Sequence, residues 1–83
     1  MTVVVRYFAA ARAAAGVEEE KLLVGDGATV ADLLEAVRGE HGPELSHVLD
    51  RCSFLLDEVA VHGTDTPMRA GQVLDVLPPF AGG

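Results

Sequence analysis

Cysteines and long apolar runs are scarce in this chain, and each scarcity excludes a class of protein. The single cysteine, Cys52, cannot form an internal disulfide framework. No apolar run approaches the roughly 20 residues that cross a bilayer, and the N-terminus lacks the basic and apolar regions of a signal peptide. These absences predict a cytoplasmic protein that does not insert into a membrane.

Basic residues are also few. Lysine and arginine together number 6, with Lys21 as the only lysine, against 13 acidic residues, so the net charge is −7. Such a surface repels phosphate backbones, and we expect no nucleic-acid partner. The same charge keeps a small protein soluble, and it favours encounter with a protein partner that presents a basic face.

Recognisable catalytic and cofactor motifs are absent. His41, His47 and His62 have neither metal-ligand spacing nor a thiol cluster beside them, so we predict no metal site. The chain contains no Walker-type phosphate loop and no dinucleotide fingerprint, so we predict that it binds no nucleotide cofactor itself. Cys52 lies among apolar residues and is interpreted as a buried, inert thiol.

Two other polar features have simple structural explanations. His41 lies at the end of a predicted helix, where a basic side chain interacts favourably with the helix dipole. The three glutamates at 18–20 are interpreted as a solvated strand edge, with docking of a basic partner as the alternative.

Thr29 opens the main predicted helix. Asp32 follows three residues later, close to the capping-box pattern, and Gly42 followed by Pro43 ends the helix. Apolar residues at i, i+3, i+4 and i+7 form one stripe along it, which consists of Val30, Leu33, Leu34 and Val37. Shorter helices are predicted over residues 9–15 and 44–51, and strands over 2–8, 18–24, 53–56, 59–61 and 72–77.

The first and last predicted strands are the most apolar. We therefore expect them to be central, adjacent and parallel, with the main helix packed across one face of the sheet. This arrangement predicts an α+β protein with the β-grasp, or ubiquitin-like, fold and a mixed sheet of four to five strands. The domain is expected to cover residues 1–77, followed by a flexible tail over residues 78–83.

The predicted tail is the most informative segment of the chain. Pro78 and Pro79 fix φ and lack N–H donors, so the chain must leave the sheet there. Gly82 and Gly83 carry no side chains, so they can enter a channel too narrow for any other residue, and the carboxylate of Gly83 is reachable. The alternative is a frayed terminus without a function.

The carboxylate of Gly83 needs activation before it can react. A carboxylate is a poor electrophile because its charge is delocalised and it has no good leaving group. Once a partner enzyme that uses ATP has joined it to AMP, it becomes an acyl phosphate anhydride that is open to nucleophiles. Attack by sulfur gives a thiocarboxylate, whereas attack by a lysine amine gives an isopeptide bond. On either route this chain is the carried group, and its partners do the chemistry.

Five segments are similar to one known family: residues 3–9, 14–17, 27–34, 65–68 and 78–83. Through them almost the whole chain resembles the MoaD/ThiS family of ubiquitin-like proteins, which includes the small sulfur-carrier subunit of molybdopterin synthase. The terminal Pro-Pro-x-x-Gly-Gly is the most specific motif. Two positions depart from the family pattern: Asp57-Glu58 stands where relatives often have Asn-Gly, and Phe80 is bulkier than the valine often found there.

The resemblance implies a cycle of sulfur loading and delivery. An adenylating enzyme related to the ubiquitin activators would activate the terminal glycine with ATP and Mg²⁺, which that enzyme and not this chain binds, and a persulfide donor would supply the sulfur. The large subunit of molybdopterin synthase would then transfer sulfur from the thiocarboxylate to a cyclic pyranopterin, forming the molybdopterin dithiolene. The implied site residues are Gly83 as the thiocarboxylated residue, Gly82 and Ala81 as the threading residues, and Phe80, Pro79 and Pro78 as partner contacts.

Three alternatives remain open at this point. The chain could carry sulfur for another pathway, such as thiamine, cysteine or tRNA thiolation. It could be a ubiquitin-like modifier that is conjugated to lysines, or a binding module whose tail is incidental. Carriers share their tail chemistry, so the sequence does not identify the final sulfur acceptor, the activating enzyme or the oligomeric state.

Overall fold

Strands and helices follow one another along the chain much as the apolar spacing predicts. The computed structural model describes residues 1–79. In this part the third helix begins at Pro43, because proline suits the first helical position. The elements are β1 (Thr2–Tyr7), α1 (Ala9–Ala15), β2 (Glu19–Leu23), α2 (Val30–His41), α3 (Pro43–Leu49), β3 (Ser53–Leu56), β4 (Val59–Ala60) and β5 (Val73–Leu77).

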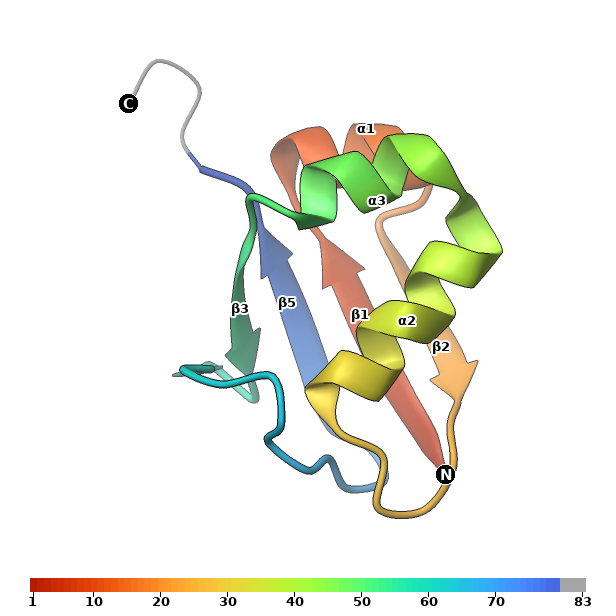
Figure 1. Cartoon of the computed structure of the whole chain (residues 1–83), viewed down its shortest axis with the longest axis vertical. Coiled ribbons are helices and arrows are strands. Elements are labelled where there is room, and N and C mark those ends of the chain that lie inside the picture. Colours follow the sequence, from red (N-terminus) through yellow and green to blue (C-terminus); the bar gives the residue numbers. More distant parts are fainter. Residues whose placement is uncertain (80–83) are drawn as a thin grey trace.

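Within residues 1–79 the sheet is mixed, and its five strands lie in the order β2-β1-β5-β3-β4. β1 pairs in parallel with β5, and the other pairs are antiparallel. The prediction that the first and last strands are adjacent, central and parallel is therefore confirmed. A parallel pair needs a crossover connection. Here most of the chain supplies it, and α2 runs across one face of the sheet (Figure 1).

The hydrophobic core lies between the sheet and α2. Alternate residues of β1 point into it, so Val3, Val5 and Tyr7 are almost fully buried. The predicted stripe of α2 is buried along its whole length, from Val30 to Val37. Burial of these apolar surfaces is the main force that holds α2 on the sheet.

α2 begins with the capping box that its sequence predicts. The Oγ1 atom of Thr29 accepts a hydrogen bond from the backbone N–H of Asp32 at 3.2 Å, and Oδ2 of Asp32 accepts one from the backbone N–H of Thr29 at 2.9 Å. Aspartate can therefore take the place of the usual glutamate. Two backbone donors at the helix start, which have no partner within the helix, are satisfied in this way.

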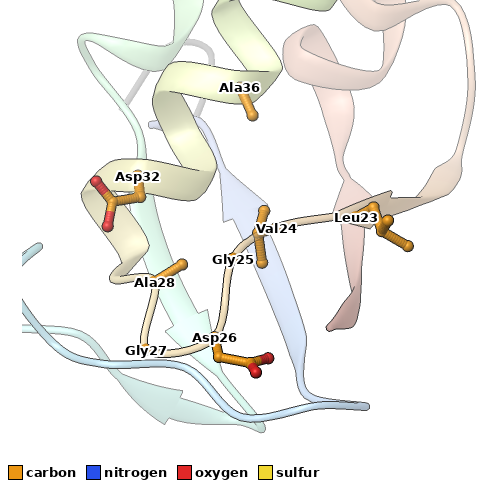
Figure 2. A pocket seen from close by; sticks show the side chains of 8 residues that line it. All are labelled: Leu23, Val24, Gly25, Asp26, Gly27, Ala28, Asp32 and Ala36. Carbon is orange, nitrogen blue, oxygen red and sulfur yellow. The ribbon is translucent and has the colours of Figure 1, made fainter.

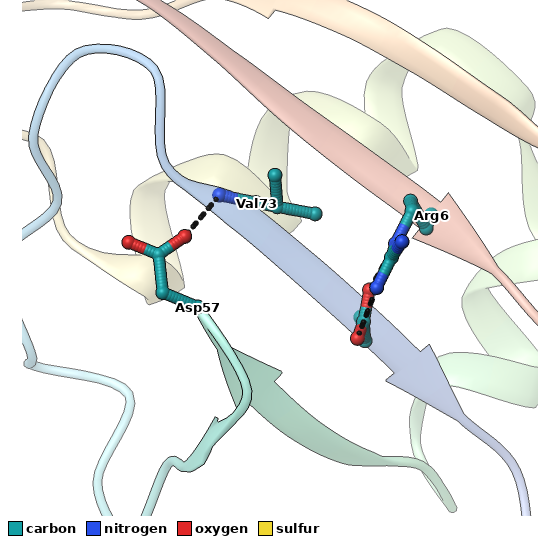
Figure 3. A network of polar contacts seen from close by, with 4 residues as sticks. Arg6, Asp57 and Val73 are labelled. Carbon is teal, nitrogen blue, oxygen red and sulfur yellow. Dashed lines mark hydrogen bonds and ion pairs between the residues drawn. The ribbon is translucent and has the colours of Figure 1, made fainter.

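The β3–β4 hairpin turns at Asp57-Glu58 without glycine. Both residues adopt left-handed backbone angles, with φ of 46° and 69°. Asp57 offsets part of this strain, because its Oδ1 accepts a hydrogen bond from the backbone N–H of Val73 at 2.9 Å (Figure 3). Its Oδ2 accepts another from the side chain of Gln72. The turn is thus joined to the start of β5.

The interpretation of the three glutamates at 18–20 as a solvated strand edge is wrong for Glu20. Glu18 and Glu19 are exposed, as a solvated strand edge requires, but Glu20 is partly buried and its Oε2 lies 2.7 Å from Nε2 of His41. The His41 ring also meets the ring of Tyr7 edge-on, with the centroids 5.8 Å apart. His41 therefore connects the end of α2 to β2 and β1 through specific contacts, in addition to any effect of the helix dipole.

Candidate functional site

The root of the predicted tail is the end of a central strand. Leu77 is the last residue of β5 and is paired with Ser53 of β3. On the other side, the backbone N–H of Phe8 donates a hydrogen bond to the carbonyl of Val76 at 3.2 Å. Pro78 follows directly and has no N–H to donate, so the pairing of β5 stops there. Strands on both sides of β5 therefore hold the base of the tail.

The predicted site residues fall on both sides of the described boundary. Pro78 is half-buried and Pro79 is exposed. The other four predicted residues lie outside the described residues, and their roles remain predictions; they are Phe80, Ala81, Gly82 and Gly83.

A groove that sequence reasoning missed borders the tail root. Ala10 of α1, Val48 of α3 and the two prolines supply its apolar wall, and two basic residues, His47 and Arg51, complete the lining. We call these residues the tail-root groove. Its members are far apart in sequence, so the only available signal was the exposure of apolar and basic residues on one short predicted helix.

Arg6 and Asp75 form a second polar feature that the sequence reading overlooked. They are opposite each other in the β1–β5 ladder, and Nε and Nη2 of Arg6 lie 2.6 and 2.9 Å from the two carboxylate oxygens of Asp75 (Figure 3). The hydrogen bond to Asp75 and its negative charge raise the pKa of Arg6. The Arg6 guanidinium also lies 5.8 Å from the centre of the exposed Phe8 ring. This pair links the two central strands on the face of the sheet opposite α2.

Cys52 has the environment of an unreactive thiol. Its Sγ donates a hydrogen bond to the carbonyl of Val48 at 3.2 Å. Burial raises the pKa of the Cys52 thiol, so less of the reactive thiolate is present near neutral pH. The residue is partly buried, not fully buried, so the structure corrects the degree of burial in the interpretation of Cys52 as a buried, inert thiol.

The histidines and acidic residues of the described part of the chain form no metal-binding cluster. Among residues 1–79, no group of three or more histidine, cysteine, aspartate or glutamate side chains is placed to hold a metal ion. His41 is engaged with Glu20, whereas His47 is exposed on α3 and His62 is exposed in the loop that follows β4.

A pocket lies at the β2–α2 loop (Figure 2), at the opposite end of the sheet from the tail root (Figure 1). Its acidic side chains, among the described residues, are Asp26 and Asp32. Asp32 belongs to the capping box of α2, and Asp26 lies 3.7 Å from the N-terminal amine. Asp32 thus has a structural role and Asp26 is exposed, and the described lining does not bring together a nucleophile, a base and an orienting residue.

The part of the chain that the structure describes has a five-stranded mixed sheet crossed by one main helix, with an extension leaving a central strand, and this arrangement defines a ubiquitin-like protein of the β-grasp fold. The chain belongs to the ThiS family, whose model matches residues 5–83. It is 37% identical over 84 residues to the molybdopterin synthase sulfur carrier subunit of Chlamydomonas reinhardtii, with 100% of both chains covered. The resemblance seen in the sequence and the predicted fold are both confirmed.

Solved structures agree with this assignment. SAMP1 from Haloferax volcanii, a small archaeal modifier protein, superimposes with a TM-score of 0.89 at 30% identity, covering 100% of each chain. A chain from the complex of subunits 1 and 2 of molybdopterin-converting factor from Helicobacter pylori superimposes with a TM-score of 0.72 at 26% identity, again over 100% of each chain. Within the described residues, no helix is long and apolar enough to cross a membrane.

Proposed function

We propose that this chain is the sulfur-carrier subunit of molybdopterin synthase and that it delivers sulfur as a thiocarboxylate on Gly83. The observation that carries the proposal is the position of the tail root. β5 is fixed between two neighbouring strands up to Leu77, and Pro78-Pro79 then ends the pairing. A rigid base followed by a narrow Gly-Gly end suits a segment that must reach into the active site of another protein.

Membership of the ThiS family and the full-length similarity to a molybdopterin synthase sulfur carrier subunit support this proposal. The described residues fit the role of a carried group, because they bring together no nucleophile, base and orienting residue of a catalytic site. The chemistry is therefore assigned to partners, and the chain contributes its terminal carboxyl group.

The first step of the proposed cycle is adenylation. In an enzyme related to the ubiquitin activators, the carboxylate of Gly83 attacks the α-phosphorus of ATP, so that an acyl–phosphate bond forms and pyrophosphate leaves. ATP and Mg²⁺ are held by that enzyme.

Sulfur is loaded in the second step. The terminal sulfur of a persulfide donor attacks the acyl carbon, and AMP leaves. A thiol then cleaves the resulting acyl disulfide, which releases the thiocarboxylate and leaves a disulfide on the donor side. This sequence balances the two electrons that the sulfur requires.

Delivery takes place on a second protein. The thiocarboxylate enters the large subunit of molybdopterin synthase, with Gly82 and Ala81 in the channel and the residues from Pro78 to Phe80 at its mouth. Sulfur passes to a cyclic pyranopterin, and the carboxylate of Gly83 is regenerated with oxygen from water. Two loaded carriers supply the two sulfurs of the dithiolene.

Removal of Gly82 and Gly83 tests the proposal. We expect the thermal midpoint to be unchanged, because β5 ends before the deleted residues, whereas sulfur transfer to the pyranopterin should be lost. A variant with both glycines replaced by alanine keeps the length of the tail and shows whether side-chain bulk alone blocks threading. A truncated protein that still supports product formation would overturn the carrier proposal.

A second function is favoured by the similarity to SAMP1, a modifier protein. Mass spectrometry of the protein from its native cells separates the two possibilities. Replacement of one oxygen by sulfur supports a carrier, whereas adducts of high mass support a modifier that is conjugated to lysines. A carrier for a different acceptor would gain the sulfur but fail to form molybdopterin with the large subunit.

A further inference from the structure

The tail-root groove differs in charge from the rest of this acidic protein. Among residues 1–79, its lining contains two basic residues, His47 and Arg51, and no acidic residue, although the chain carries a net charge of −7. Both basic side chains are exposed. The groove is therefore a small basic site on a surface that is otherwise mainly negative.

The two basic residues are not used by ion pairs within the described part of the chain. Three arginines there do have acidic partners: Arg6 pairs with Asp75, Arg12 with Glu18 and Arg38 with Asp50. Among residues 1–79, neither His47 nor Arg51 has a carboxylate within 4.0 Å. Asp50 is the neighbour of Arg51 in sequence, but its carboxylate accepts a hydrogen bond from Arg38 instead.

The helix dipole accounts for only part of this arrangement. Basic residues near the end of α3 interact favourably with its last carbonyl groups, and this alone could explain His47 and Arg51. It does not explain the apolar wall beside them, where Val48 is half-buried and Pro78 and Pro79 come from a different part of the chain.

The size of the groove indicates what can occupy it. Its volume is about 190 Å³, which is below the range of roughly 300–1,000 Å³ that is usual for small-molecule sites. A space of this size suits one or two side chains of another protein. An apolar side chain would cover Val48 and Pro78, and a neighbouring carboxylate would meet Arg51.

We propose that the tail-root groove is a docking site for the large subunit of molybdopterin synthase, and that it receives an apolar side chain of that subunit flanked by an aspartate or glutamate. This inference rests on the proposed function. When the tail enters the large subunit, Pro78 and Pro79 lie at the mouth of the channel, so the groove that they border faces the same protein. Docking there would hold the domain in one orientation while Gly83 reacts.

Charge reversal at Arg51 tests the proposal, with Arg69 as the matched control. Arg69 is also exposed and without an acidic partner among the described residues, but it precedes β5, at the other end of the strand from the tail root. Arg51→Glu and Arg69→Glu change the net charge equally. Titration calorimetry with the purified large subunit should show that Arg51→Glu weakens binding about tenfold, whereas Arg69→Glu stays within about twofold.

Salt dependence and a space-filling variant strengthen the test. The difference between the two variants should shrink as ionic strength rises, because salt screens exposed charges. Ala10→Leu narrows the groove without changing the charge and should also weaken binding. A thermal melt of each variant alone checks that the domain still folds.

The outcomes separate failure of this inference from failure of the proposed function. Equal effects of Arg51→Glu and Arg69→Glu, or no effect of either while the wild type binds, would overturn the groove proposal alone. So would impaired thiocarboxylate formation with unchanged binding to the large subunit, because the groove would then serve the activating enzyme. A wild-type protein that neither acquires sulfur nor binds the large subunit would overturn both proposals.

Discussion

At the scale of single residues, Tyr7 stands out in the core. Its side chain is buried, and among the described residues its hydroxyl has no hydrogen-bond partner. Burial, with a smaller effect of the Glu20 charge, raises the pKa of Tyr7 well above its ordinary value. Such an unsatisfied hydroxyl costs about 1–3 kcal/mol of desolvation, so the ring and not the hydroxyl accounts for the contribution of Tyr7 to stability.

Tyr7→Phe should therefore leave stability near pH 7 unchanged or raise it by about 1 kcal/mol. The two proteins should diverge in alkali. The pKa of Tyr7 is higher in the folded state than in the unfolded chain. The stability that depends on the neutral form of Tyr7 is therefore fully present below the pKa of the unfolded chain, about 10, and is lost as pH rises above that value. Urea unfolding from about pH 8 to about pH 11 should show this loss in the wild type and less of it in the variant.

Burial also raises the pKa of Cys52, so this thiol too lowers stability in alkali. Because Cys52 is present in both proteins, the difference between their unfolding free energies isolates the effect of Tyr7. A variant that is clearly less stable at neutral pH would show that the hydroxyl has a partner, such as a bound water.

Arg6 and Asp75 show why some polar contacts of the sheet were missed from sequence. Asp75 is 5% exposed, yet it interrupts an apolar strand, which from sequence alone is compatible with an exposed position. Its burial is tolerated because Arg6 lies opposite it and satisfies both oxygens. That match follows only once β1 and β5 are aligned residue by residue. Apolar alternation excludes a shift of one residue, which would exchange the two faces of a strand, but it does not exclude a shift of two.

At the scale of elements, α2 contributes most of the helical part of the core. Leu34→Ala should lower the free energy of unfolding by about 2–4 kcal/mol, because Leu34 is 7% exposed and its removal leaves a cavity against the sheet. Glu35→Ala, at the adjacent exposed position, is the control and should change stability by less than about 0.5 kcal/mol. Chemical denaturation of both variants measures the difference, and equal small effects would place the stripe on the wrong face.

Local signals explain why the elements could be predicted. The stripe of α2, the Thr29–Asp32 capping box and the Gly42-Pro43 break each depend on residues within a few positions of one another. The contacts of His41 with Glu20 and Tyr7 depend on segments that meet only in the folded chain. The tail-root groove was missed for the same reason, because α1, α3 and the prolines that follow β5 each supply part of it.

At the scale of the whole molecule, the tail is expected to work with the domain as one binding unit. Phe80→Ala should weaken binding to the large subunit by about 2 kcal/mol, the size typical of an aromatic hot spot, with little change in the stability of the isolated domain. Phe80 lies outside the described residues, so this expectation rests on its place after two prolines, which limit the freedom lost on docking.

Calorimetry with the partner and a melt of the variant alone distinguish the two possible roles of Phe80. A large loss of stability with unchanged affinity would assign the ring to the core of its own domain. Phe8→Ala is a useful comparison, because Phe8 is an exposed aromatic residue on the sheet side of the same end of the molecule.

The parallel pairing of β1 with β5 also determines when the domain can be completed during synthesis. The bond between Arg6 and Asp75 joins residues 69 positions apart, and contacts so distant in sequence form late and slowly. β1 leaves the ribosome first, yet its central partner is the last strand to emerge. A chain cut short before β5 would leave Val5 and Tyr7 without their partners in β5 and open to proteases and chaperones. Since the reactive glycines follow β5, only a chain that already contains everything needed to fold can carry them.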